Sequence, residues 1–153
     1  MINVGDSLPD MALTAPDGST VKISDYAGKK LVLFFYPKAS TPGCTTESRD
    51  FSALLPEFEK AGAAILGMSA DTPKRQQNFI NKQELTVDIA SDESTEFLEA
   101  IGVWAEKKMY GKTFMGIIRS TFLLDENGKV IQAWPKVRVK GHAEEVLEAV
   151  KAV

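Results

Sequence analysis

The chain has 153 residues, 44% hydrophobic and 25% charged, with a formal net charge of −3. These values indicate a single domain over residues 1–153 with enough apolar side chains to form a core. So balanced a charge excludes strongly basic nucleic-acid binders and proteins held on membranes by polybasic segments. No stretch has the length of a membrane span, and the first residues lack the basic and apolar regions of a signal peptide. We therefore expect a cytoplasmic protein.

The first third of the chain predicts a short hairpin followed by a buried strand. Residues 8–23 contain two strand-like runs around Pro16-Asp17-Gly18, which is a turn signal. Residues 24–28 indicate a tight turn or a single helical turn. Residues 31–36 are all apolar and rich in β-formers, as in a strand that is buried on both faces, and Pro37 ends this strand.

The only cysteine, Cys44, lies at a predicted helix start. Thr41 is a good N-cap, and Pro42 suits the first helical position, where its missing N–H costs nothing. Cys44 therefore falls in the first turn, where unpaired amides and the helix dipole stabilise a thiolate. A lone cysteine is often only a small buried hydrophobe. The polar residues, proline and glycine around this one favour a reactive thiol instead.

The helix after Cys44 should be amphipathic. Its apolar positions recur at helical spacing and should pack on a sheet: Phe51, Leu54, Leu55 and Phe58. Charged positions should face water: Glu47, Arg49, Glu57 and Lys60. Pro56 removes one helical hydrogen bond, so we expect a kink or a break near residues 54–55.

The middle of the chain alternates predicted strands and helices. Residues 63–70 read as a buried strand that ends at Asp71, and Thr72-Pro73 repeats the cap-and-proline signal and opens a surface helix over 73–83. A short strand over 87–90 precedes a helix over 94–101, which Gly102 closes.

Residues 104–116 show neither period 2 nor period 3.6, so we interpret them as a loop that closes over something. The run Gly111-Lys112-Thr113 resembles the end of a phosphate-binding loop, but Glu106 stands where that motif needs glycine. Strands over 117–124 and 129–134 flank an Asn-Gly turn, and residues 141–153 form an amphipathic last helix.

The spacing of Pro37, Thr41 and Cys44 resembles the active-site signature of the peroxiredoxins. The run YPKASTPGCTTE is similar to the peroxiredoxin Q, or bacterioferritin comigratory protein, subfamily. The likeness extends from VGDSLPDMALTAPDG through Asp71 to RSTFLLDENGKV. It implies an α/β, thioredoxin-like fold: a central mixed sheet flanked by helices, with an N-terminal β-hairpin extension. The order of predicted elements agrees with that fold.

The resemblance implies a thiol peroxidase that reduces hydrogen peroxide and organic hydroperoxides. In this interpretation the Cys44 thiolate attacks one peroxide oxygen and becomes a sulfenic acid. Thr41, Arg119 and the helix-start amides near Gly43 and Cys44 would stabilise the charge that develops on the other oxygen. Pro37 would shield and shape the site. Glu47 would either support this cluster or remain a solvated carboxylate, and the chemistry calls for no cofactor and no metal.

Many members that resemble this chain carry a second, resolving cysteine, at positions where this sequence has Arg49 and Ile80. Without it, the sulfenic acid needs an external thiol such as glutathione, a glutaredoxin or a thioredoxin. We expect a monomer or a weak homodimer. Because Pro56 should shorten the helix that begins at Pro42, we also expect its first turns to unwind and expose the oxidised cysteine.

Three alternative functions and one basic segment also have to be considered. A thioredoxin-like disulfide exchanger normally has a Cys-X-X-Cys pair, but Thr41 occupies the partner position. A redox sensor would form the same sulfenic acid only once. A Cys–His pair would need His142, the only histidine, which we interpret as part of a solvated helix start. Alternating Lys136, Arg138 and Lys140 indicate an exposed strand edge.

Overall fold

The computed structural model describes residues 1–153. Its main sheet has seven strands in the order β2-β1-β5-β4-β3-β8-β9. These strands are β1 Leu13–Thr14, β2 Thr20–Val21, β3 Lys30–Phe35, β4 Ala63–Ser69, β5 Asp88–Ser91, β8 Ser120–Leu124 and β9 Val130–Trp134. The helices are η1 Ile23–Tyr26, α1 Pro42–Lys60, α2 Pro73–Gln83, α3 Glu96–Ile101 and α4 His142–Lys151. Strands β6 Trp104–Met109 and β7 Lys112–Ile117 form a separate pair.

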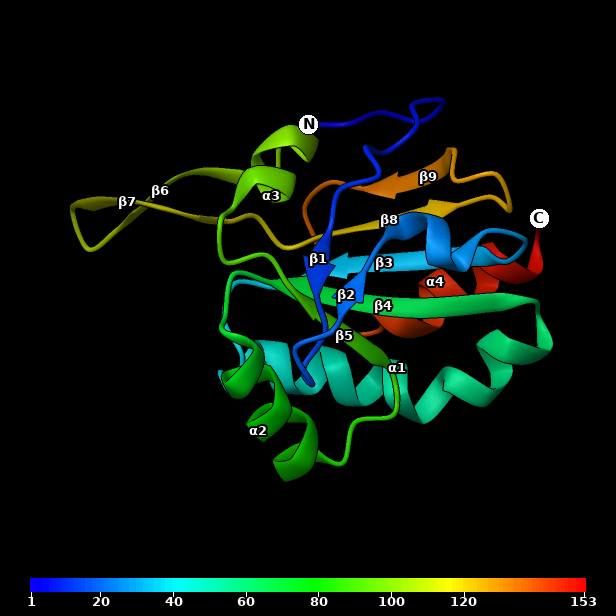
Figure 1. Ribbon diagram of the computed structural model, residues 1–153, viewed down its shortest axis with the longest axis horizontal. Helices are drawn as coiled ribbons and strands as arrows, with labels where there is room; N and C mark the ends of the chain where they lie inside the picture. Colours follow the sequence, from blue (N-terminus) through cyan, green and yellow to red (C-terminus); the bar gives the residue numbers. More distant parts are fainter.

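Strand β3 is the centre of the sheet. It pairs in parallel with β4 and antiparallel with β8, so the sheet is mixed. Its side chains alternate between two hydrophobic cores. Val32 and Phe34 face the core under α1, α2 and α4, whereas Leu33 and Phe35 face the core closed by α3. Figure 1 shows the resulting layers, with helices on both faces of the sheet. The predicted thioredoxin-like architecture is confirmed.

The N-terminal hairpin lies where the turn signal predicted it. Strands β1 and β2 pair antiparallel around the turn that contains Gly18, whose φ is 88°. Thr14 of β1 also pairs with Ser91 of β5, so the hairpin adds two strands to the edge of the main sheet.

Helix α1 starts as predicted but does not break at Pro56. Thr41 occupies the N-cap position in an extended conformation, and Pro42 is the first helical residue. The helix spans 19 residues, and Figure 1 shows it bending rather than stopping, so of the two expected outcomes the helix shows a bend and not a break. Phe51 and Phe58 lie on either side of Pro56, and both are fully buried. Packing at both ends therefore outweighs the one hydrogen bond that proline removes.

The prediction of a loop over residues 104–116 is wrong. Strands β6 and β7 pair antiparallel along six residues each, and they project from the molecule in Figure 1. The turn is Tyr110-Gly111, with both φ angles positive (53° and 75°), as a two-residue hairpin loop requires. Because most of this hairpin is solvent-exposed on both faces, its sequence needs no alternation of apolar and polar residues, so the pattern gave no strand signal.

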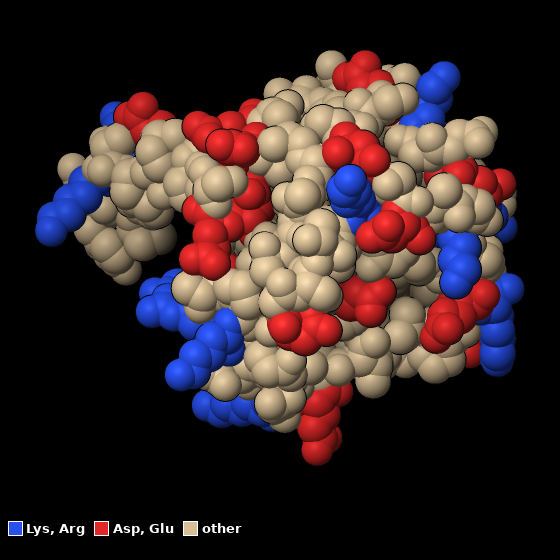
Figure 2. All heavy atoms as spheres, in the orientation of Figure 1, with Lys and Arg blue, Asp and Glu red and all other residues tan.

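The surface carries mixed charge. Figure 2 shows acidic and basic side chains interspersed over one face of the body, without a large region of a single sign. No helix combines the length and the apolar character needed to cross a membrane. Lys136, Arg138 and Lys140 are exposed as expected, but they follow β9 in an irregular segment and do not form a strand.

His142 is buried, so its interpretation as a solvated residue is wrong. It is 3% exposed, and its Nε2 lies 2.8 Å from Thr121 Oγ1 on β8. The imidazole also packs edge-on against Phe51 and Trp134. The start of α4 is thus fastened to the central sheet and to α1. His142 is the first residue of α4, where the amphipathic pattern only begins. The spacing of the apolar residues therefore did not show that the first turn of this helix is buried.

Burial makes His142 a source of acid sensitivity. Its pKa is lowered by burial and by the charge of Arg119, although Glu145 acts in the opposite direction. His142 of the unfolded chain therefore binds a proton more readily than His142 of the folded protein. The free energy of unfolding consequently decreases as the pH falls below about 6.5, the ordinary pKa of histidine. We expect the difference in unfolding free energy between the wild type and His142→Gln to shrink from pH 7.5 to pH 5.5 in urea titrations. A constant difference would contradict this.

Candidate active site

Three segments converge around Cys44. The loop after β3 delivers the chain to the N-terminus of α1, Cys44 lies in the first turn, and Arg119 stands in the link between β7 and β8. Ser120 pairs with Phe35 at the end of β3, so the sheet register brings Arg119 beside that first turn. Arg119 is also anchored at its carbonyl, which accepts a hydrogen bond from Val137 N at 2.9 Å.

The Arg119 guanidinium joins Cys44 to Glu47. Its Nη2 donates to Cys44 Sγ at 3.2 Å, and its Nη1 donates to Glu47 Oε1 at 2.7 Å. Cys44 is fully buried, Glu47 is 1% exposed, and the Arg119 side chain is 18% exposed. A fixed cation within hydrogen-bond distance of the sulfur stabilises a thiolate far better than it would in water. The Arg119 side chain is therefore mostly enclosed and contacts both Cys44 and Glu47.

Charge and burial oppose each other at Glu47. Burial raises the pKa of this carboxyl to about 7, even though Arg119 acts to lower it. Burial also acts to lower the pKa of Arg119, but Glu47 and Cys44 outweigh it, so the Arg119 pKa is raised and the guanidinium stays charged. The pKa of Lys107 on β6 is lowered by burial and next by Arg119. The hairpin thus brings a second cation toward the site.

Thr41 does not use its side chain to cap α1. Its Oγ1 donates instead to Lys38 O at 2.7 Å, and no side-chain bond satisfies the first amides of the helix. Those amides, from Gly43 and Cys44, are left available to an incoming oxygen atom. A Cβ added to Gly43 would lie 3.1 Å from Arg119 Nη2, so glycine allows the close approach of the guanidinium.

The other predicted residues fall into two groups. Pro37 is half-buried in the loop between β3 and α1, which is consistent with a role in shaping that loop. Arg49 is exposed on α1 and Ile80 is half-buried on α2, so neither position supplies a sulfur. His142 is hydrogen-bonded to Thr121 and not to Cys44. No group of three or more His, Cys, Asp or Glu side chains is arranged to hold a metal ion.

Glu47 was predicted to face water or to support the site, and the structure places it beside Arg119. A signal was present in the sequence: Cys44, Glu47, Ser48 and Phe51 follow helical spacing, and all four are buried. A carboxylate in such a stripe needs a cation nearby. The residues that sequence reasoning missed altogether are Lys107 and the buried polar groups near Asp71.

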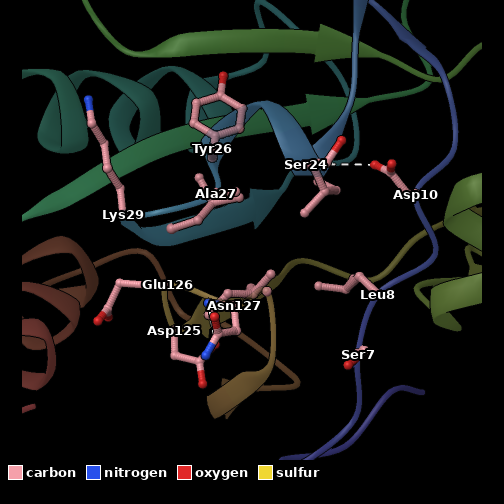
Figure 3. Close-up of a pocket in the computed structure, with 14 residues that line it drawn as sticks. Ser7, Leu8, Asp10, Ser24, Tyr26, Ala27, Lys29, Asp125, Glu126 and Asn127 are labelled. Carbon is pink, nitrogen blue, oxygen red and sulfur yellow. Dashed lines mark hydrogen bonds between the residues drawn. The ribbon is translucent and has the colours of Figure 1, made fainter.

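One well-formed cavity lies away from Cys44. This cavity of about 360 Å³ is bounded by the N-terminal segment, η1 and the β8–β9 turn, and Figure 3 shows Asp10, Ser24, Tyr26 and Asn127 around it. Within it, Ser24 N donates to Asp10 Oδ1 at 3.2 Å. The cavity contains no cysteine or histidine, so it offers no thiol or imidazole nucleophile.

Glu47 should make stability fall as pH rises. Its folded pKa of about 7 exceeds the ordinary value of 4.5, so the folded protein binds the extra proton between these two pH values. Stability from this group is therefore present below about pH 4.5 and is lost toward pH 7, by roughly 3 kcal/mol at most. We expect Glu47→Gln to remove this dependence in urea titrations across that window. If the unfolding free energies of the wild type and Glu47→Gln changed in parallel with pH, the Glu47 carboxyl would be ionised across the whole window.

The chain is similar to known proteins over nearly its whole length. The AhpC/TSA family matches residues 4–133. Peroxiredoxin Bcp of Xanthomonas campestris is 52% identical over 143 residues, covering 94% of this chain and 89% of the relative. Peroxiredoxin Bcp of Bacillus subtilis is 45% identical over 150 residues, covering 98% of this chain and 96% of the relative.

Solved structures agree with these relatives. A structure of X. campestris peroxiredoxin Q superposes with a TM-score of 0.91 and 50% identity, covering 97% of each chain. A structure of X. campestris bacterioferritin comigratory protein, solved in work on its alkyl peroxide reduction activity, has a TM-score of 0.89 and 49% identity over 96% of this chain and 98% of that one. The chain therefore belongs to the AhpC/TSA family, as a thiol peroxidase of the Bcp, or peroxiredoxin Q, type.

Proposed function

We propose that the chain reduces hydrogen peroxide and alkyl hydroperoxides through Cys44. The observation that carries this is the 3.2 Å contact between Arg119 Nη2 and Cys44 Sγ at the first turn of α1. The thiolate sulfur attacks the nearer peroxide oxygen, forming an S–O bond as the O–O bond breaks. The other oxygen leaves as hydroxide or alkoxide and takes a proton from water. Cys44 is oxidised to a sulfenic acid, and the peroxide is reduced.

The groups around Cys44 have complementary roles. Arg119 and the free amides of Gly43 and Cys44 donate to the peroxide, and these fixed donors stabilise the charge that grows on the leaving oxygen. The Thr41 hydroxyl already donates to Lys38 O, so its oxygen accepts a hydrogen bond from the hydroxyl group of the peroxide. One acceptor and several donors orient the O–O bond along the line of attack.

Thr41→Val tests this acceptor. Valine keeps the shape of threonine but can neither accept from the peroxide nor donate to Lys38 O. We expect the rate of Cys44 oxidation, measured by stopped-flow fluorescence, to fall at least about tenfold, which corresponds to roughly one strong hydrogen bond. Thr46 is the matched control, because it lies one turn further along α1 and its hydroxyl donates to Pro42 O at 3.1 Å. Thr46→Val should react at nearly the wild-type rate.

Regeneration requires an external thiol. Cys44 is the only cysteine, and Arg49 and Ile80 stand where relatives of this type can have a resolving one. The attacking thiol forms a mixed disulfide with Cys44 and releases water, and a second thiol then returns Cys44 to the thiolate. Glutathione, a glutaredoxin or a thioredoxin can each supply these two thiols. Such turnover needs a compartment that keeps thiols reduced, which favours the cytoplasm, and we propose a monomer or a weak homodimer there.

The decisive experiment is steady-state peroxide consumption by the whole chain with each reductant in turn. We expect many turnovers per Cys44 with at least one of glutathione, glutaredoxin or thioredoxin, and a glutathione adduct by intact mass when only glutathione is present. One turnover followed by arrest with every reductant would instead indicate a sensor. Disulfide reduction without peroxide consumption would indicate a disulfide exchanger.

A further inference from the structure

Lys107 is a cation without a counter-ion beside the Cys44 site. It lies half-buried on β6, in the hairpin that projects in Figure 1 from the side of the sheet at which β3 ends. The four ion pairs of the structure all join other residues. A partly buried charge that no opposite charge compensates is unfavourable. The Lys107 ammonium is therefore available to an anionic group from outside the chain.

The side chain of Lys107 extends toward the base of the hairpin. A Cβ placed on Gly116 would lie 3.4 Å from Lys107 Cδ and 3.8 Å from Lys107 Cε, although Lys107 pairs with Phe114, two positions nearer the tip. The missing side chain at Gly116 thus leaves room for the lysine stem. Burial and then the charge of Arg119 lower the pKa of Lys107, whereas Cys44 acts to raise it. Both groups are therefore within electrostatic reach of the ammonium.

The hairpin face that carries Lys107 has no carboxylate. Directly paired residues share a face of a sheet, and so do alternate residues along a strand. Phe114 is paired with Lys107, and the next pair on the same face is Met109 with Lys112. Phe114 and Met109 are 44% and 56% exposed. Glu106, the only acidic residue of the hairpin, lies on the other face. This face thus offers two cations and two apolar side chains to a ligand.

Exposed charges along the nearby edge of the sheet favour the same kind of ligand. Phe35, Ser120 and Trp134 mark this edge in the register of β3, β8 and β9. Segments 36–43, 72–77 and 135–141, which follow β3, β4 and β9, contain no exposed acidic residue. The acidic residues at this edge follow β5, on the side of β4 away from β8. An anion is thus attracted to the side of the edge at which Arg119 lies. The exposed cations of the three segments are Lys38, Lys74, Arg75, Lys136, Arg138 and Lys140.

The reducing thiol is the co-substrate for which the site offers no other binding group. Arg119, Thr41 and the first amides of α1 already supply the donors and the acceptor for a peroxide. The thiol must come from solution at every turnover, because Cys44 is the only cysteine. Its sulfur forms an S–S bond with Cys44 as the S–O bond breaks, and the hydroxide that leaves takes a proton. A contact that orients the rest of the thiol would speed this step.

We propose that Lys107 is a specificity-determining residue that binds the anionic group of the reducing thiol. This proposal rests on the proposed peroxidase function. A small thiol with a carboxylate or sulfonate near its sulfhydryl group places that anion on Lys107 while its sulfur approaches Cys44, and its carbon atoms contact Phe114. A neutral thiol lacks the ion pair. A cationic thiol is repelled by Lys107 and Arg119 together.

Three thiols of similar size test this preference: 2-mercaptoethanesulfonate, 2-mercaptoethanol and cysteamine, which are anionic, neutral and cationic. Cys44 is first oxidised with one equivalent of hydrogen peroxide, and the mixed disulfide is then followed by intact mass after acid quenching. For each thiol the rate in Lys107→Met is divided by the wild-type rate, so the intrinsic reactivity of the thiol cancels. We expect this ratio to be about fivefold lower for the anionic thiol than for the neutral one. It should be highest for cysteamine.

Lys108→Met is the matched control, because Lys108 is the next residue of β6 and is exposed on the other face of the hairpin. Its ratios should be equal for the three thiols. Lys107→Arg keeps the charge and should retain the wild-type preference. The fivefold difference should shrink as KCl is raised from about 20 mM to about 500 mM, because salt screens the charge. Equal ratios for all three thiols in Lys107→Met, or the same pattern in Lys108→Met, would overturn the proposal.

A second measurement separates this proposal from the peroxidase function. If wild-type Cys44 gained no oxygen from peroxide, the peroxidase function would fail. Reduced Cys44 can still be alkylated by iodoacetate, which is an anion, and by iodoacetamide, which is neutral. The rate with iodoacetate relative to iodoacetamide should fall about fivefold in Lys107→Met and should be unchanged in Lys108→Met. An unchanged relative rate in Lys107→Met would show that Lys107 does not attract anions to Cys44.

Discussion

Cys44→Ser should abolish peroxide consumption down to the rate of a buffer control. Serine nearly matches the shape of cysteine, but its hydroxyl remains protonated beside Arg119, and an alcohol does not attack an O–O bond at a useful rate. The loss should exceed about a thousandfold, because the covalent step itself is removed. Reduced wild-type protein mixed with one equivalent of hydrogen peroxide should gain one oxygen atom by intact mass, and the variant should gain none.

Ser48→Ala is the companion control for this measurement. Ser48 lies one turn after Cys44, is fully buried, and its hydroxyl has no hydrogen-bond partner. Its removal should leave peroxide consumption unchanged and should not lower stability. If Cys44→Ser consumed peroxide as fast as the wild type, another group would carry the reaction. A chain with one cysteine leaves no second sulfur for a covalent thiol mechanism.

Local signals predicted the elements that carry the site. Thr41-Pro42 and Thr72-Pro73 each mark the observed first residue of a helix, because an N-cap and a proline at the first position act within a few residues. The buried strand β3 followed from an uninterrupted apolar run. The place of Cys44 in the first turn of α1 could therefore be predicted without knowledge of the tertiary structure.

Contacts between distant segments could not be predicted in this way. Arg119 lies 75 residues after Cys44, and only the pairing of β8 with β3 brings the two together. The hydrogen bond between Asp71 Oδ2 and Ala39 N depends likewise on β3 and β4 lying side by side. The continuous α1 reflects the packing of Phe51 and Phe58, which outweighs the local effect of Pro56. In each case a contact between segments that are distant in the sequence decides the structure, and the neighbouring residues alone do not.

The site combines two requirements that conflict. Exclusion of water strengthens the attraction between a buried guanidinium and the sulfur beside it, yet the same exclusion of water keeps a reducing thiol away. Glu47 adds a third charge, and burial keeps its pKa near neutrality, so Arg119 is shared between a carboxyl and a thiolate. The charge that Arg119 offers to the sulfur thus depends on whether Glu47 holds its proton.

Arg119→Ala should slow the oxidation of Cys44 by on the order of a hundredfold or more. The change removes the donor at 3.2 Å from the sulfur, and loss of one preorganised donor typically has an effect of this size. It also leaves Glu47 buried without its cation, which should lower stability. Stopped-flow rates at pH 7 measure the first effect, and urea titrations measure the second.

The double variant Arg119→Ala/Glu47→Gln separates these two effects. A neutral amide removes the unpaired buried charge, so the double variant should regain stability relative to Arg119→Ala. Its reaction with peroxide should stay slow, because the donor to the sulfur is still missing. Recovery of the rate together with stability would mean that Arg119 acts only through the fold.

Arg119→Lys should be impaired nearly as much as Arg119→Ala. The planar guanidinium reaches Glu47 through Nη1 and Cys44 through Nη2, and a single ammonium cannot donate to both positions at once. Arg138 is the control because it is exposed in the segment after β9, so Arg138→Lys should leave the rate unchanged. A wild-type rate in Arg119→Lys would show that only the positive charge is needed. A slow reaction would show that the reaction depends on the fork that joins the thiolate to the carboxyl.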